Sequence, residues 1–244
     1  MILSYTQIEE IAAAVTKDFN EFFFGERAAP ETHYAQATPI DWLATDYLGL
    51  RVSYARLSED GSICGLTAYT DTEYAATYRG VTHVIPLRAN EVLLDSSFME
   101  PGQVRSRCGK RRFTLAHECA HQLLFQMESD EARRACEEAY APRTAYSLRD
   151  LKTREDWNEW QANALGAAIL MPQREIDRAM YHLARGRKLI DYEGWFGYMD
   201  LMVLKQLCQT LGVSRSAAVI RLRQLGYMEE RPYAEYIDPL EVWA

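Results

Sequence analysis

The stretch RRFTLAHECAH, residues 111–121, decides how the chain is interpreted, because it places two histidines four residues apart in a helical setting. Residues four apart on a helix lie on the same face, one turn from each other. His117 and His121 can therefore direct a ring nitrogen at one metal ion. Glu118 is offset around the helix, where it can take a proton from a water molecule that the ion activates. The spacing predicts two metal ligands and a separate proton acceptor.

Apolar residues around this motif indicate a helix that packs on one side. They are Phe113, Ala116, Ala120, Leu123 and Leu124. The alternative, two surface histidines that fall four apart by chance, is disfavoured by this setting. Cys119 lies on roughly the opposite side of the helix from His117, so we do not expect it to be a ligand.

A catalytic zinc ion needs a third protein ligand and an open position for water. The best candidate is Glu159, which lies in a helical segment with a buried face. That face consists of Ala162, Leu165, Ala168 and Ile169. Asn163 follows Glu159 by one turn, and its amide can hold the second nitrogen of a ligand histidine. Spacing alone leaves a solvated Glu159 as an alternative, with three other carboxylates nearby: Glu155, Asp156 and Glu175.

The rest of the pattern predicts helices around a small sheet. Expected helices cover residues 6–24 with a capping box at Thr6, 38–49 with Thr38 as cap, 112–127, 155–170, 174–185, and two short helices within 199–226. Expected strands cover 52–57 and 63–69, paired as a hairpin, and then 81–87 and 91–95. Residues 128–154 are polar and read as a connection.

Bulk composition indicates a globular chain in a reducing compartment. Of the 244 residues, 48% are hydrophobic, as in an ordinary globular protein. The net charge of -8 argues against a protein that binds nucleic acid over its whole surface. The cysteines are five in number and none are spaced Cys-x-x-Cys, so a disulfide scaffold is not expected. The N-terminus lacks the features of a signal peptide, and no apolar run is long enough to span a membrane. We therefore expect a cytoplasmic location.

Residues 111–121 resemble the active-site helix of the ImmA/IrrE family of metallo-endopeptidases. The segment Glu159-Trp160-Gln161-Ala162-Asn163, followed by Ile169-Leu170-Met171-Pro172, is similar to that family's second motif, in which the glutamate is the third zinc ligand. Many members carry a second acid where this chain has Gln161. Residues 207–226 are similar to the helix-turn-helix-like segment that follows the peptidase core. The resemblance covers about residues 50–226.

The resemblance implies an α+β fold with a zincin-like core, in which a small, mostly antiparallel sheet lies against the active-site helices. We expect N-terminal helices at 1–49, the peptidase core at 50–190, helix-turn-helix-like helices at 191–228 and a tail at 229–244. The implied activity is zinc-dependent cleavage of a helix-turn-helix transcriptional repressor, which relieves repression. A His/His/Glu site also accepts manganese or iron.

Other roles follow from what a zincin needs. A peptide substrate usually lies along a sheet edge, for which the sequence favours residues 92–95. A group that stabilises the developing oxyanion is needed, and Tyr146, Tyr181 and His182 are the candidates. The alternative function is a DNA-binding or partner-binding regulator that keeps a metal site without proteolysis. DNA binding by residues 201–228 is not favoured, because four basic residues on an acidic chain attract phosphate weakly.

Overall fold

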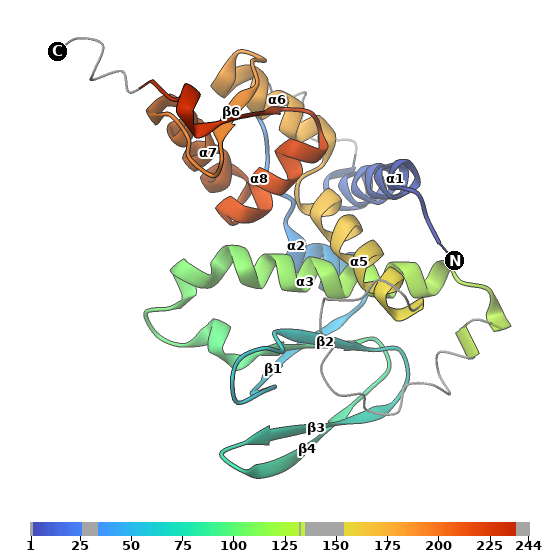
Figure 1. Cartoon of the computed structure of the whole chain (residues 1–244). Coiled ribbons are helices and arrows are strands. Elements are labelled where there is room, and N and C mark those ends of the chain that lie inside the picture. The colour runs from blue at the N-terminus through green and yellow to red at the C-terminus, as the bar shows by residue number, and fades with distance from the viewer. Residues whose placement is uncertain (1, 26–33, 132, 135–153, 238–244) are drawn as a thin grey trace. The chain divides into compact units, whose positions relative to one another are not determined.

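The computed structural model describes residues 2–25, 34–131, 133–134 and 154–237 (Figure 1). The chain divides into two compact units. The first comprises Met1–Ala28 and Thr38–Leu170, and the second comprises Ala29–Ala37 and Met171–Ala244. Among the described helices, none combines the length and apolar character that a membrane span requires.

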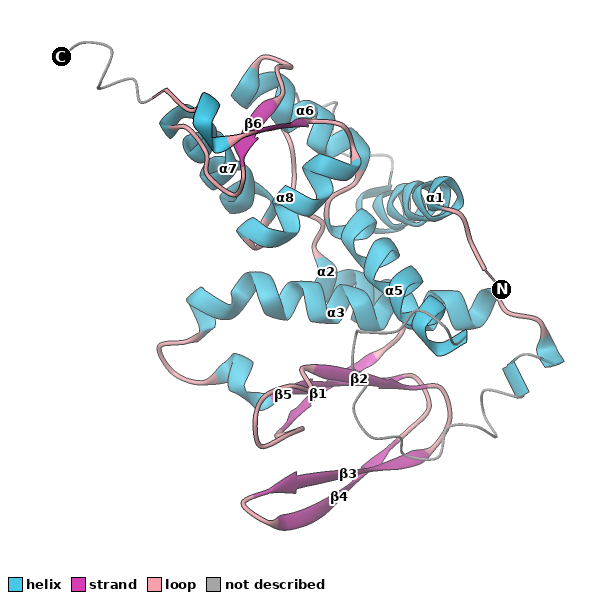
Figure 2. Cartoon of the chain, in the orientation of Figure 1, coloured by secondary structure: helices cyan, strands magenta, loops and turns pink. Residues whose placement is uncertain are grey.

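The first unit combines helices with short strands, so the predicted α+β class is confirmed (Figure 2). Its helices are α1 (Tyr5–Phe24), α2 (Ile40–Trp42), the π-helical turn η2 (Leu43–Tyr47), the 3-10 turn η3 (Ser96–Met99), α3 (Val104–Met127) and α5 (Arg154–Leu170). Its strands are β1 (Arg51–Ala55), β2 (Gly65–Ala68), β3 (Thr72–Tyr78), β4 (Val81–Leu87) and β5 (Glu91–Asp95). The strand β3 was not expected from the sequence.

A three-stranded sheet in the order β1-β5-β2 supports the helices. β1 runs parallel to β5, and β2 runs antiparallel to it. The predicted hairpin between residues 52–57 and 63–69 is therefore wrong, since both strands pair with β5 instead. The predicted substrate edge at residues 92–95 is wrong for the same reason, because β5 is the central strand. The described edges of this sheet are β1 and β2.

The separate hairpin β3-β4 packs below this sheet through a small apolar core. The buried residues of this core are Leu57, Ala68, Leu87 and Leu93. The half-buried ring of Tyr74 packs against them, and its hydroxyl donates to the backbone oxygen of Leu57. Because β5 is covered on both faces, four of its five residues are buried.

The long helix α3 lies between the sheet and helix α5, and α5 in turn packs on α1 (Figure 1). Gly166 allows α3 and α5 to approach closely, because a Cβ atom there would lie only 3.0 Å from the backbone nitrogen of His117. Thr38 does not cap a helix as predicted, since Pro39 occupies the cap position. The Thr38 hydroxyl instead donates to the backbone oxygen of Ile169 at the end of α5, at 2.7 Å.

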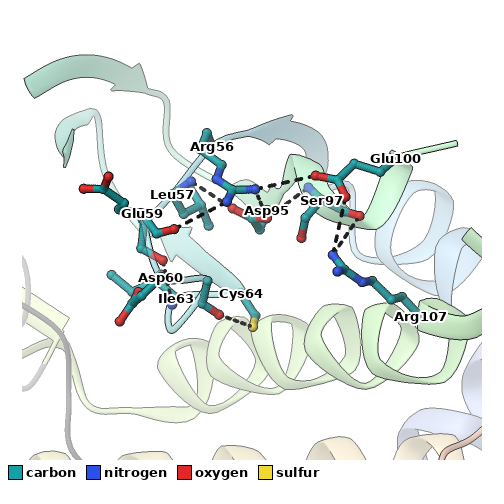
Figure 3. A network of polar contacts seen from close by, with 12 residues as sticks. Arg56, Leu57, Glu59, Asp60, Ile63, Cys64, Asp95, Ser97, Glu100 and Arg107 are labelled. Carbon is teal, nitrogen blue, oxygen red and sulfur yellow. Dashed lines mark hydrogen bonds and ion pairs between the residues drawn. The ribbon is translucent and has the colours of Figure 1, made fainter. Parts of the chain in front are cut away.

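Polar contacts fix the loops that lead from the sheet into α3 (Figure 3). The Asp95 carboxylate at the end of β5 accepts hydrogen bonds from the backbone nitrogens of Leu57 and Ser97. Arg56 lies 3.9 Å from Asp95 and 3.7 Å from Glu100. These contacts join the loop after β1 to the turn η3, which precedes the metal-motif helix.

The N-terminal helix α1 begins at Tyr5, one residue earlier than the sequence predicts. Its capping box is formed by Ser4 and Gln7, not at Thr6. The backbone nitrogen of Leu3 donates to the side-chain oxygen of Gln161 on α5, at 2.7 Å. This long-range contact attaches the start of α1 to the helix that carries the second motif.

The described residues of the second unit form three α-helices and a two-stranded parallel sheet. Its elements are α6 (Gln173–Ala184), β6 (Leu189–Tyr192), α7 (Tyr198–Leu211), α8 (Arg215–Gln224), β7 (Met228–Arg231) and the 3-10 turn η4 (Tyr233–Glu235). Gly212 ends α7 in the left-handed conformation, and Ser214 caps α8 by accepting from the backbone of Ala217. The division after Leu170 differs from the expected boundary after residue 190, because α6 packs on α7.

Candidate metal centre

Side chains from α3 and α5 converge at one point in the first unit. The Nε2 atoms of His117 and His121 lie 3.1 Å apart. The Glu159 carboxylate meets both rings, at 3.3 Å from Nε2 of His117 and 3.1 Å from Nε2 of His121. Among the described residues, His117, His121 and Glu159 form a group whose ligand atoms lie close enough together to hold a metal ion.

The spacing of these atoms fits a tetrahedral ion. Zinc binds histidine nitrogen and carboxylate oxygen at about 2.0–2.2 Å, so neighbouring ligand atoms of a tetrahedron lie about 3.3–3.5 Å apart. The observed separations of 3.1–3.3 Å are close to that value. Two ring nitrogens that face each other and a carboxylate form a donor set that zinc prefers. Three protein ligands leave a fourth position for water or substrate.

The pKa values of the converging groups reflect their closeness. Burial opposes protonation of His117, but the hydrogen bond and charge of Glu159 raise its pKa above the ordinary value. Burial also works against ionisation of Glu159, but hydrogen bonds to the two histidines hold its pKa well below the usual range. Without an ion, the imidazoles and the carboxylate attract each other through a proton. A metal ion would replace that proton as the shared positive charge.

Asn163 lies on α5 beside His117, where its amide contributes to the raised pKa of the histidine. The Nδ1 atom of His117 is nevertheless buried and has no hydrogen-bond partner in the described part of the chain. A ligand histidine usually donates its second ring N–H to a carbonyl or carboxylate. The sequence suggests that Asn163 accepts this hydrogen bond, and that role stays a prediction.

Glu118 is adjacent to the ligands but belongs to a different face of α3. Its side chain is buried, and burial raises its pKa above the ordinary value for a glutamate. It is not a member of the His117, His121 and Glu159 group. A buried carboxyl whose pKa is shifted toward neutrality is suited to exchange a proton during a reaction.

The edge strand β2 covers Glu118. A Cβ atom at Gly65 would lie 2.9 Å from Oε1 of Glu118 and 2.5 Å from Cγ2 of Thr114. The strand can approach the helix this closely because residue 65 lacks a side chain. Sequence reasoning did not single out Gly65 or Gly166, although a glycine inside a strand or helix pattern can signal close approach of two backbones.

Gln161, which stands where many relatives have a second acid, is buried on α5 and binds the backbone of Leu3. A neutral amide satisfies this contact without adding a second buried charge near Glu159. Glu159 is therefore the carboxylate that α5 brings to the histidines. Of the other acids considered from the sequence, Glu175 lies in the second unit and accepts from the backbone of Gln36. The side chains of Glu155 and Asp156 lie outside the described residues.

The structure does not test the three oxyanion candidates. Tyr146 lies outside the described residues. Tyr181 and His182 are exposed on α6 in the second unit, where His182 stacks near the ring of Tyr34. Their assignment stays a prediction.

Three of the four basic residues of the segment 201–228 make contacts within the second unit, and the fourth, Lys205, is exposed. Arg221 is fully buried and donates to the backbone oxygen of Met171 at 3.0 Å. Arg223 pairs with Asp191 and Glu230, and the Arg215 guanidinium lies over the ring of Phe196. Cations that are buried or paired contribute little attraction for phosphate. That DNA binding by this segment is not favoured stays a prediction.

Comparison with known families agrees with this geometry. The sequence model of peptidase family M78, described as the IrrE N-terminal-like domain, matches residues 105–223. That range contains both helices of the ligand group. No curated protein matches the chain. The family match supports the resemblance drawn from the motifs: residues 105–223, just under half of the chain, are similar to the IrrE N-terminal-like domain of this peptidase family.

Proposed function

We propose that the chain is a zinc-dependent endopeptidase of the ImmA/IrrE type that cleaves a helix-turn-helix repressor and so relieves repression. The observation that carries the catalytic part is the convergence of His117, His121 and Glu159, with the buried Glu118 beside them. The repressor as substrate is supported by the family resemblance. Zinc is the preferred ion for this donor set, with manganese or iron as alternatives.

In this proposal His117, His121 and Glu159 hold the ion. A zinc ion bound there would polarise the scissile carbonyl and lower the pKa of a water molecule. Glu118 takes the proton of the attacking water and later delivers it to the leaving amine. Its burial supports both steps, because a raised pKa allows the same carboxyl to accept and to return a proton near neutral pH.

The substrate backbone is proposed to pair with the outer edge of β2. β2 has β5 as its one strand neighbour among the described residues, which leaves its other edge for an added strand. Gly65 and the side chain of Thr67 lie against α3, so the added strand would run close to Glu118. This edge replaces the one that the sequence favoured at residues 92–95.

The proposed setting is the cytoplasm. Cys64, Cys108, Cys119 and Cys208 are free thiols in the described structure, which agrees with a reducing compartment. Burial raises the pKa of the Cys119 thiol, so this residue next to Glu118 is unreactive and is not a competing nucleophile.

Comparison of wild type with Glu118→Gln in the producing cells tests the proposal. New protein N-termini, identified by mass spectrometry, should appear in cells with wild type and be missing with Glu118→Gln, while both proteins bind zinc equally. Glu59→Gln, an exposed substitution in the loop after β1, serves as the control and should behave as wild type. If wild type generates no new N-termini, or Glu118→Gln generates the same ones, the chain is a binding regulator and not a peptidase.

A further inference from the structure

The face of α3 that carries Glu118 also holds the edge strand β2 at three successive positions. Gly65 lies against Thr114 and Glu118. Two residues along the strand, Thr67 and Ala68 are bound by Gln122. The ring of Tyr69, directly after β2, stacks on Phe125 with centroids 4.1 Å apart. β2 therefore runs along α3 in the same direction as the helix.

The middle contact is polar and buried. Gln122 is 1% exposed, and its Nε2 donates to the Thr67 hydroxyl at 2.7 Å and to the backbone oxygen of Ala68 at 3.0 Å. The Thr67 hydroxyl in turn donates to the backbone oxygen of Glu91 on β5, at 3.4 Å. One amide group thus connects the helix to both strands of the antiparallel pair.

We propose that Gln122 is a positioning residue that sets the register of β2 over Glu118. β2 is four residues long and pairs with a single strand in the described structure, so pairing alone specifies its register weakly. Apolar packing is also tolerant of sliding, whereas two hydrogen bonds from one amide have a defined direction. Gln122 follows Glu118 by one helical turn, so the group that fixes the strand and the group that moves the proton share one face of α3.

This inference rests on the proposed function, since the register matters if a substrate strand pairs with β2. A substrate held by the backbone of β2 has its scissile bond placed by the register of that strand relative to Glu118. A displacement of about 1 Å in the reacting groups can reduce catalysis roughly 100-fold. Gln122 would then act on the reaction without touching the substrate or the metal ligands.

The test compares Gln122→Met with the double variant Gln122→Met/Thr67→Val in the full-length chain. Methionine has a similar volume and removes both donors, which leaves the buried Thr67 hydroxyl without its donor. Valine then replaces that hydroxyl by a methyl group of the same shape, which should restore most of the lost stability. The oxygen of Ala68 still lacks its donor in the double variant. Gln126→Met, exposed one turn later on α3, is the matched control.

Three quantities are measured: thermal stability, hydrogen exchange of the amides of residues 65–68, and kcat/KM of the zinc-loaded protein on a pool of quenched fluorescent peptides. Gln122→Met should speed exchange in β2 and lower kcat/KM roughly 10–100-fold at unchanged zinc content. In the double variant, stability should recover while fast exchange and low kcat/KM persist. Gln126→Met should match wild type in all three.

A structural role for Gln122 predicts something different. If exchange and kcat/KM recover together with stability in the double variant, Gln122 satisfies a buried hydroxyl and does not set the register, and the inference is overturned. If wild type cuts no peptide of the pool, the proposed function loses its support. Hydrogen exchange alone then tests whether Gln122 sets the register of β2. Exchange in β2 that is the same in Gln122→Met as in wild type overturns the inference in that case too.

Discussion

Gly166 of α5 lies directly against the backbone of His117 in α3, where a methyl group would fit only if the helices shifted by a few tenths of an ångström: a Cβ atom would meet the His117 nitrogen at 3.0 Å and the Ala116 oxygen at 3.1 Å. Glu159 lies two turns earlier on the same helix. The distance between α3 and α5 therefore determines how closely Glu159 approaches the two histidines.

Gly166→Ala should push the two helices apart. Overpacking of this kind costs about 1–3 kcal/mol in the free energy of unfolding. We also expect weaker zinc binding, because the carboxylate moves away from the ring nitrogens. Urea unfolding and calorimetric titration with zinc measure the two effects. Wild-type zinc affinity in a destabilised Gly166→Ala protein would contradict the idea that this contact sets the ligand distances.

Gly65→Ala should displace the Glu118 side chain, because the new methyl group would meet Thr114 at 2.5 Å and Glu118 at 2.9 Å. We expect peptidase activity to fall more than zinc affinity, since the atoms nearest to the new methyl group belong to Thr114 and Glu118 and not to a proposed ligand. Thr114→Ser removes the methyl group of the shorter contact and should restore part of the activity in the double variant. Equal activity in the single and double variants would indicate that the Thr114 contact is not the cause.

The local part of the site could be predicted from the sequence because it depends on one helix. Two histidines four apart share a face whatever the rest of the chain does. Glu159 could be proposed as the third ligand, but sequence spacing could not establish it, because a ligand on another helix depends on long-range packing. Here Gly166 allows the two helices to approach, and Gln161 binds the backbone of Leu3. The family match covers this second motif as well.

The sheet order could not be predicted from alternation of residues. Period-two patterns identified β1, β2, β4 and β5, but such a pattern does not specify the partner of a strand. β1 and β2 both pair with β5, which removes the predicted hairpin and moves the edge from β5 to β2. The four-residue strands β6 and β7 were not expected from the sequence.

Asp95 should make folding sensitive to acid. Burial opposes its ionisation, but hydrogen bonds from Ser97 and Leu57 and the charge of Arg56 together lower its pKa in the folded state (Figure 3). The unfolded value is about 3.9, so the stabilisation is complete above that pH and is lost as the pH falls through the lower, folded pKa.

Asp95→Asn should therefore reduce stability at pH 7 by about 1.5–3 kcal/mol, the range for a hydrogen bond to a charged group. The loss should shrink between pH 5 and pH 2, where the wild-type carboxylate takes up its proton. Urea unfolding of both proteins over this range measures the difference. A difference that stays constant down to pH 2 would show that the Asp95 charge is not what stabilises these loops.

Arg221 should act as a structural residue of the second unit and not as a DNA contact. Arg221→Met leaves the Met171 carbonyl without its donor and should destabilise the second unit by about 1–3 kcal/mol. Arg215→Met, at an exposed position on the same helix, should cost less. Gel-shift titration of wild type at low and high salt completes the comparison. Tight binding to DNA that weakens steeply with salt would favour the regulator alternative.

The most direct measurement of the central claim is a crystal structure of the zinc-loaded protein with anomalous diffraction recorded on both sides of the zinc absorption edge. The account predicts one zinc ion bound by Nε2 of His117, Nε2 of His121 and the carboxylate of Glu159, with Glu118 near the ion but not bound to it. An ion held without Glu159, or one that takes Glu118 as a ligand, would contradict the ligand set and the proton-transfer role together.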